Sequence, residues 1–184
     1  MEYGVIIEND AKIDVVCCQF GDETECVKWL RGYILHQLED NMSWDAGKTH
    51  THVDWFMTED NGFDYAEVDF GDGLFTARIL PVLDVPKKED ETEIDETLRR
   101  GYLKYILMCL NRGNTGDLSK VAGVIVGDVE LQASGFQSTH LYNPQRWEPI
   151  MVACDCDGNE YLVYLHQLTR SQVEFIAREF FKFK

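Results

Sequence analysis

The sequence is poor in basic residues: 17 of its 184 residues are lysine or arginine, against 33 aspartates and glutamates, so the formal net charge is −16. A surface of this charge repels nucleic acid and anionic membranes and attracts basic proteins or cations. The chain also lacks any apolar run near the roughly 20 residues that a membrane-spanning helix needs. Residues 1–10 lack the basic start and apolar stretch of a secretory signal. We therefore expect a cytoplasmic protein.

Several motifs that identify enzymes are missing. Residues 113–116 are rich in glycine, but the Lys-Ser/Thr pair of a phosphate-binding loop does not follow them. Ser138, Thr139 and His140 have no nucleophile-elbow glycines around them and are typical of a polar loop. The sequence therefore predicts no cofactor, assigns no catalytic residue and favours a protein that is not an enzyme.

Six cysteines are present, and in the expected reducing compartment they predict free thiols rather than disulfides. Cys17, Cys26 and Cys109 lie in apolar segments and are expected in the core. Cys154 and Cys156 flank Asp155 just before Asp157-Gly158-Asn159, which predicts a hairpin turn. A calcium loop is excluded because Glu160 stands where such a loop has its glycine.

The first half of the chain predicts an antiparallel sheet and one helix. Residues 3–7 and 13–20 are rich in strand-forming residues and should form a hairpin. A helix should begin after Asp22, which with Glu25 has the form of a capping box, and end in the polar stretch 41–48. Three further strands, joined by short turns, predict an antiparallel meander over residues 50–58, 63–70 and 74–83.

The second half predicts two more helices. One carries Leu98, Tyr102, Ile106 and Leu110 at helical spacing, and the other begins near Thr169. Between them, residues 121–131 should form one strand, residues 134–149 an irregular loop, and residues 149–156 and 160–166 a hairpin. These elements predict an α+β fold, with an antiparallel sheet of hairpins and a meander covered by about three amphipathic helices. Since no linker divides the chain, one domain over residues 1–184 is expected.

A possible metal site lies on one predicted strand. Alternate residues of a strand share a face, so His50, His52 and Asp54 should project together at about 7 Å steps. Two imidazoles and a carboxylate are plausible zinc or iron ligands. This spacing resembles part of the His-x-His-x-Asp motif of metallo-β-lactamase hydrolases. The resemblance covers only these residues, and because Trp55 stands where that family has its next histidine, its activity is not carried over.

The acidic residues are concentrated in one part of the sequence. Between residues 54 and 96 there are fourteen carboxylates against three bases, Arg78, Lys87 and Lys88. Glu67 and Asp69 should share a strand face about 7 Å apart, near the spacing of phosphates along a nucleic-acid strand. The residues that we expect to bind a partner are Asp60, Asp64, Glu67, Asp69, Asp72, Glu89, Asp90, Glu91, Glu93, Asp95 and Glu96.

These observations favour an acidic, non-enzymatic binding protein. It would dock on a basic nucleic-acid-binding protein or nucleoprotein complex, imitate a phosphate backbone, and inhibit or modulate its target without binding nucleic acid or membrane itself. In composition and size it resembles the inhibitors that phages and mobile elements direct against restriction enzymes and CRISPR effectors. The alternatives are a metal-dependent hydrolase or nuclease that uses His50, His52 and Asp54, an accessory module of a larger assembly, and acidity that serves solubility alone.

Overall fold

A computed structural model describes most of the chain. The described residues are 2–9, 12–20, 22–44, 52–57, 63–69, 74–86, 91–120, 122–138 and 148–184. Side chains are described in residues 2–7, 22–33, 77–86, 91–120, 122–138 and 148–184. The structure divides into two compact units, Met1–Pro81 and Val82–Lys184, and each is treated by itself below. The single domain expected from the sequence stays a prediction.

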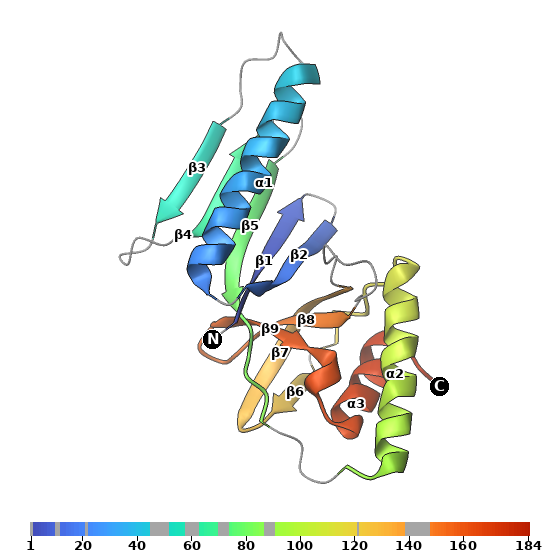
Figure 1. Ribbon diagram of the computed structural model, residues 1–184. Coiled ribbons are helices and arrows are strands. Elements are labelled where there is room, and N and C mark those ends of the chain that lie inside the picture. The colour runs from blue at the N-terminus through green and yellow to red at the C-terminus, as the bar shows by residue number, and fades with distance from the viewer. Residues whose placement is uncertain are drawn as a thin grey trace. The chain divides into compact units, whose positions relative to one another are not determined.

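The first unit is built on a five-stranded antiparallel sheet (Figure 1). Its strands are β1 (Tyr3–Asn9), β2 (Lys12–Phe20), β3 (His52–Met57), β4 (Phe63–Asp69) and β5 (Leu74–Pro81). The predicted hairpin pairs β1 with β2, and the predicted meander pairs β3 with β4 and β4 with β5. Strand β1 also pairs with β5, which joins both parts into the order β2-β1-β5-β4-β3.

Helix α1 (Glu23–Trp44) packs on one face of this sheet. The Asp22 carboxylate accepts a hydrogen bond from the Glu25 backbone N–H at 2.9 Å, which stabilises the start of the helix as predicted. Cys26 and Leu30 of α1 are buried against Val5 and Ile7 of β1 and against β5. The last residue of α1, Trp44, lies within the polar stretch 41–48 in which the end of the helix was expected.

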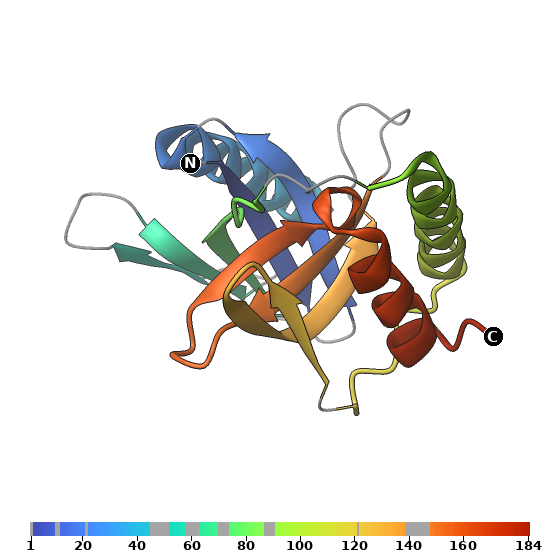
Figure 2. The same cartoon turned by 90° about the horizontal axis from the view of Figure 1, so that it is seen from below.

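The second unit has a four-stranded antiparallel sheet in the order β6-β7-β8-β9. Its strands are β6 (Gly123–Val126), β7 (Val129–Ser138), β8 (Pro149–Cys154) and β9 (Glu160–Tyr164). Figure 2 shows α2 (Glu93–Asn111) and α3 (Arg170–Phe181) on one side of this sheet, and a short 3₁₀ helix, η1 (Leu165–Gln167), precedes α3. Phe136, Phe180 and Phe181 are among the largest buried side chains of the core between these layers.

Both helices of this unit begin with a capping box. The Thr169 hydroxyl and the Gln172 side chain satisfy each other's backbone N–H groups at the start of α3, as the sequence predicted. Thr92 and Asp95 do the same at the start of α2. The described residues form two antiparallel sheets and three α-helices, so the predicted α+β class is confirmed.

Two expectations for this unit are wrong. Residues 121–131 form two strands, because Gly127 has a φ of 62° and turns the chain between β6 and β7. Strand β7 then continues to Ser138, into the segment expected to be irregular. A bulge at Ser134 explains the error: Ala133 pairs with Ala153 and Gly135 with Val152. The extra residue moves the buried positions from odd to even numbers, so no continuous alternation marks the strand.

Within the part of the chain that the structure describes, no helix is both long enough and apolar enough to cross a membrane.

Candidate functional site

The strand register brings acidic residues of different sequence segments into one row. In β3 and β4, Asp54 lies opposite Glu67, and His52 lies opposite Asp69. In β5, Thr76 is the partner both of Glu67 and of Glu8 in β1. A single row across four strands therefore runs from Glu8 through Thr76 and Glu67 to Asp54. Neighbouring positions in such a row are about 5 Å apart between Cα atoms.

This row lies on the sheet face that α1 does not cover. Ala77 and Ile79 of β5 belong to the core beneath α1. Alternate residues of a strand share a face, and so do directly paired residues of neighbouring strands. Positions 76 and 67 therefore occupy the other face, with positions 8, 54, 69 and 52. We call positions Glu8, Asp54, Glu67 and Asp69 the acidic face.

The acidic face has few basic neighbours within the described strands. Arg78 occupies the same face of β5, opposite Tyr65, and His52 occupies the position opposite Asp69. Carboxylates at directly paired positions repel each other and destabilise a sheet. The positions of Asp54 and Glu67 are paired in this way.

Three other acidic residues of the first unit, Asp60, Asp64 and Asp72, were also predicted to bind a partner, and none of them belongs to the acidic face as defined. Asp64 falls at a register shift, since Phe56 pairs with Tyr65 and Met57 with Phe63, and it has no partner in β3. Asp60 and Asp72 lie outside the described residues, as does His50 of the possible metal site. Glu8, in contrast, was missed by the sequence analysis. Only the pairing of β1 with β5 brings it into the row, and no local pattern indicates that pairing.

The predicted acidic residues of the second unit make contacts within that unit. Glu91 forms an ion pair with Arg99, its Oε2 lying 3.1 Å from Nε, and both side chains are only 15% exposed. The other Glu91 oxygen accepts a hydrogen bond from the backbone N–H of Arg170 at the start of α3. Arg99 also donates to the carbonyl of His166 at 2.7 Å. Glu91 thus connects α2 with α3, and its charge is used inside the fold.

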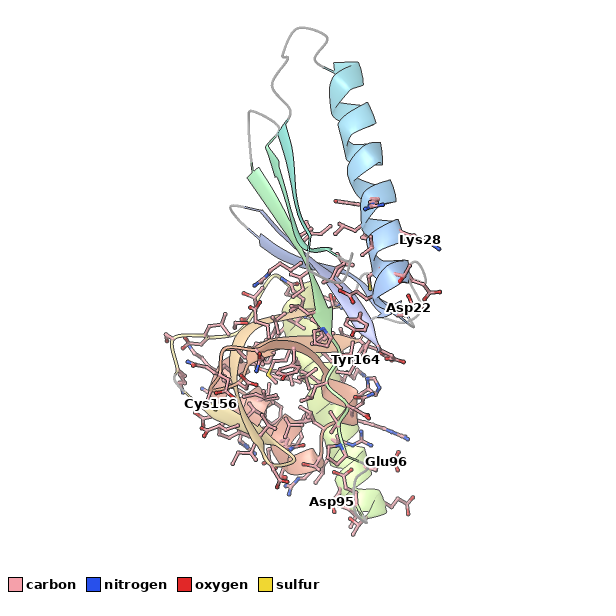
Figure 3. All side chains as sticks on the ribbon, turned by 90° about the vertical axis from the view of Figure 1, so that its left-hand side faces the viewer. Asp22, Lys28, Asp95, Glu96, Cys156 and Tyr164 are labelled. Carbon is pink, nitrogen blue, oxygen red and sulfur yellow. The ribbon has the colours of Figure 1, made fainter. Side chains whose placement is uncertain are left out.

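Asp95 and Glu96 also have partners on their own helix, and Figure 3 labels both residues near the start of α2. The Asp95 carboxylate accepts hydrogen bonds from the Thr92 hydroxyl and backbone N–H, and these lower its pKa below the ordinary 3.8. Glu96 pairs with Arg100 one turn later. Glu93 is exposed, whereas Glu89 and Asp90 lie outside the described residues.

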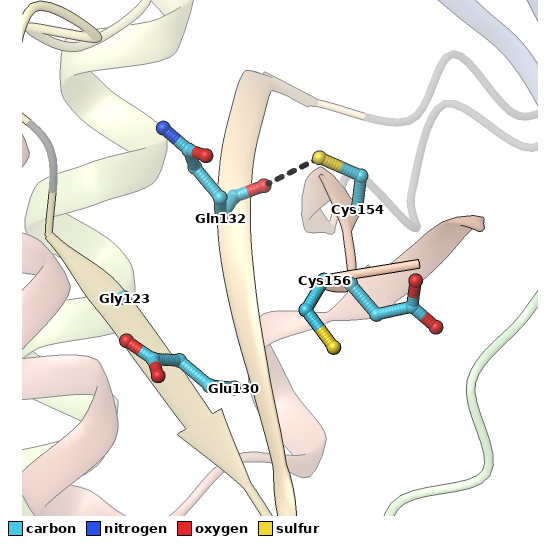
Figure 4. Close-up of a pocket in the computed structure, with 6 residues that line it drawn as sticks. Gly123, Glu130, Gln132, Cys154 and Cys156 are labelled. Atoms are coloured by element: carbon cyan, nitrogen blue, oxygen red, sulfur yellow. Dashed lines mark hydrogen bonds between the residues drawn. The ribbon is translucent and has the colours of Figure 1, made fainter. Parts of the chain in front are cut away.

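The cysteines of the hairpin after β8 line a shallow pocket of about 180 Å³ (Figure 4). Its walls are formed by Gly123, Glu130, Gln132, Cys154, Asp155 and Cys156. The Cys154 thiol points to the carbonyl of Gln132 at 3.8 Å. All four cysteines whose side chains are described, Cys26, Cys109, Cys154 and Cys156, are free thiols. Cys26 is buried and Cys109 half-buried, so both contribute to the cores in which they were expected.

The turn itself is organised by Asp155. Its carboxylate accepts hydrogen bonds from the Asn159 side chain at 3.0 Å and from the backbone N–H groups of Asn159 and Asp157. The Asn159 contact is the main cause that lowers the Asp155 pKa below 3.8. These oxygens already serve the predicted hairpin. Among the described side chains, no group of three His, Cys, Asp or Glu residues is arranged to hold a metal ion.

Ser138 and Cys154 do not come together. Ser138 is buried at the end of β7 opposite Pro149, whereas Cys154 is paired with Gln132 near the other end of β7. Thr139 and His140 lie outside the described residues.

The chain matches no family model, no curated protein and no solved structure. Any function must therefore be argued from the chain itself.

Proposed function

We propose that this chain is an acidic binding protein, not an enzyme, that docks through its acidic face on a basic nucleic-acid-binding protein in the cytoplasm and inhibits or modulates it. The observation that carries the proposal is the row across the sheet in which Asp54 pairs with Glu67, and Glu67 and Glu8 pair with Thr76 from its two sides. Asp69 lies two residues from Glu67 on the same strand and face.

The spacing of this face suits a groove that binds a phosphate backbone. Across the strands, the Asp54 and Glu67 positions are about 5 Å apart and the Glu67 and Glu8 positions about 10 Å apart, and along β4 the Glu67 and Asp69 positions are about 7 Å apart. Phosphates along one strand of a duplex rise by about 3.4 Å each and are further separated by the winding of the backbone. A basic groove could therefore meet several carboxylates at once, and the encounter would be steered by charge.

The distribution of charge between the units supports the same view. Met1–Pro81 contains 17 acidic and five basic residues, a net charge of −12, whereas Val82–Lys184 contains 16 and 12, a net charge of −4. Solubility alone needs no such concentration in one unit. Clustered like charge destabilises a folded protein, and a contact with a basic partner would compensate for that cost.

The test compares two variants with the same charge change. The face variant carries Glu8→Gln, Asp54→Asn, Glu67→Gln and Asp69→Asn. The control variant carries Glu2→Gln, Asp84→Asn, Asp128→Asn and Asp157→Asn, all at exposed positions. Each protein is immobilised, incubated with nuclease-treated lysate of the native host, and eluted with rising salt. Mass spectrometry identifies the proteins that elute, and the purified candidate is then titrated at several salt concentrations.

The expected result is a basic nucleic-acid-binding protein, for example a nuclease that acts in defence against foreign DNA, that the parent and the control variant retain. The face variant should bind it at least about tenfold more weakly and with a smaller salt dependence. The parent chain should also displace a labelled DNA duplex from this protein. Equal binding by face and control variants would overturn the proposal.

A metal-dependent hydrolase or nuclease is the second candidate, because the register brings position 52 opposite position 69 and position 54 opposite position 67. Histidine and carboxylate ligands are what zinc and iron use. Elemental analysis of protein purified without chelator separates the two functions. A near-stoichiometric metal that is lost with His52→Ala would favour the hydrolase, and a metal-free protein that still binds its partner would favour the acidic binding protein.

A further inference from the structure

Helix α2 carries one apolar face that is buried in the second unit and a second apolar set, of which Tyr105 also packs within that unit. Tyr102, Ile106 and Leu110 are buried in the core. A second set recurs at intervals of four, three, four and three residues. This set, which we call the apolar stripe, consists of Ile94, Leu98, Gly101, Tyr105 and Met108.

The apolar stripe is accessible to solvent along most of its length. Ile94 is 72% exposed, Leu98 40% and Met108 43%, and Gly101 is also exposed. Tyr105 is half-buried, since its hydroxyl donates to the Phe181 carbonyl at 2.8 Å. Alternating steps of four and three residues keep a seam on one side of a helix, and two helices pair along such a seam. Three exposed apolar side chains, Ile94, Leu98 and Met108, therefore lie on one seam that is arranged to pack against another helix.

The midpoint of the stripe is a glycine. Gly101 has no atom within 4 Å of the place where a Cβ would lie. A glycine inside a helix weakens it by about 1 kcal/mol relative to alanine, and nothing in the described structure requires one here. A second helix crossing at this point could approach the backbone closely.

The stripe is nearly symmetric about Gly101, and this indicates what covers it. Ile94 and Met108 are each seven residues from Gly101, and Leu98 and Tyr105 lie three and four residues from it. A two-fold axis at Gly101 would place Ile94 of one copy beside Met108 of a second, antiparallel copy. Contacts of this kind, in which one patch meets itself, are typical of symmetric dimers.

The charges of α2 also fit an antiparallel copy. Glu93 is exposed in the first turn, whereas Lys104 and Arg112 are exposed in the second half. An antiparallel pair brings the acidic end of each copy beside the basic half of the other and also aligns the helix dipoles favourably. A parallel pair would place like ends together.

We infer that the apolar stripe of α2 is a self-association surface, which pairs α2 with the α2 helix of a second copy in antiparallel orientation about Gly101. One helix pair buries a small area, so the dimer is expected to be in exchange with the monomer at micromolar concentrations. This surface lies in the second unit and is independent of the acidic face of the first.

The first test measures the mass of the full chain by sedimentation equilibrium over a range of concentrations. The parent should change from monomer to dimer as concentration rises. Leu98→Glu should weaken the dimer at least about tenfold, because it places a charge in the seam. The control is Ile125→Glu, which makes the same kind of change at a 62% exposed residue of β6 and should leave the dimer unchanged.

Gly101→Gln provides a variant that should not harm the fold. Glutamine is a better helix former than glycine, and the space around the Gly101 position is open in one copy. At a concentration where the parent is monomeric, the variant should melt no lower than the parent and keep its helical circular dichroism, while its dimer forms only at much higher concentration.

Orientation is tested by exchanging charges. Glu93 and Lys104 are about 16 Å apart along one helix, too far to pair within one copy. Glu93→Lys and Lys104→Glu should each weaken the dimer, and together they should restore it. A chain that stays monomeric at all concentrations, or one in which Leu98→Glu and Ile125→Glu act alike, overturns the inference. A dimer that the exchange does not restore overturns the antiparallel orientation.

Discussion

At the scale of single residues, acidic side chains that look equivalent in the sequence differ in what they do. Glu91 and Glu96 belong to the same run of charge, yet Glu91 is largely buried between α2 and α3 while Glu96 lies on the surface of α2. When a largely buried ion pair loses one partner, the charge of the other partner stays buried without an opposite charge beside it, and this destabilises the fold. An exposed pair contributes little because water and salt screen it.

Glu91→Gln is therefore expected to lower the free energy of unfolding by about 1–3 kcal/mol, since Arg99 would lose its charged partner. Glu96→Gln removes the same charge from the exposed pair with Arg100 and should change the free energy by less than about 0.5 kcal/mol. Urea unfolding of both variants at neutral pH measures the difference. Similar small effects for both would show that Glu91 does not stabilise the contact between the helices.

At the scale of elements, glycines decide where the chain of the second unit turns. Gly113 and Gly116 follow α2 with φ angles of 82° and 87°, which residues with a side chain rarely adopt. They differ in their surroundings. A Cβ at Gly116 would lie 3.2 Å from the Phe136 ring and 3.3 Å from the Phe181 ring, whereas the Gly113 position has no atom within 4 Å.

Alanine substitutions at Gly113 and Gly116 separate the cost of the backbone conformation from the cost of crowding in the core. Gly113→Ala should lower the free energy of unfolding by about 1–2 kcal/mol, because a residue with a Cβ is strained in a left-handed backbone conformation. Gly116→Ala should cost about 1–3 kcal/mol more, because two core phenylalanines must also move. Thermal and urea unfolding provide the two values. If Gly116→Ala were no more damaging than Gly113→Ala, the core beside this loop would be looser than the structure indicates.

At the scale of the whole molecule, the uneven charge should make stability depend on salt. At 0.1 M ionic strength, salt largely screens repulsion between exposed charges more than about 10 Å apart and partly weakens it at shorter range. The melting temperature of the parent should therefore rise between low and moderate sodium chloride concentrations. Because Asp54 and Glu67 of the acidic face occupy directly paired positions, the acidic face should contribute more to this rise than scattered carboxylates do.

The face and control variants described above test this expectation. At low salt the face variant should melt at a higher temperature than the control variant, and its melting temperature should rise less with added salt. These results are expected if the carboxylates of the acidic face serve binding and lower the stability of the fold. Equal salt dependence in both variants would mean that repulsion at the acidic face is not a significant cost.

Much of the fold could be read directly from the sequence because its signals are local. Capping residues such as Asp22 and Thr169, helical spacing in α2 and α3, and turn residues between strands depend only on neighbours a few positions away. The same locality explains the failures. The bulge at Ser134 breaks the alternation on which strand prediction relies, and the turn at Gly127 divides one apolar run into two strands.

The sequence by itself determined the net charge, the α+β class and the location of most elements. Tertiary structure alone decided which carboxylates act together. Pairing of β1 with β5 brings Glu8 into the same row as Glu67 of β4 and Asp54 of β3. Packing of α2 on α3 largely buries Glu91. Such contacts join residues that are far apart in the chain. Their energies depend on register and burial, which no local pattern contains.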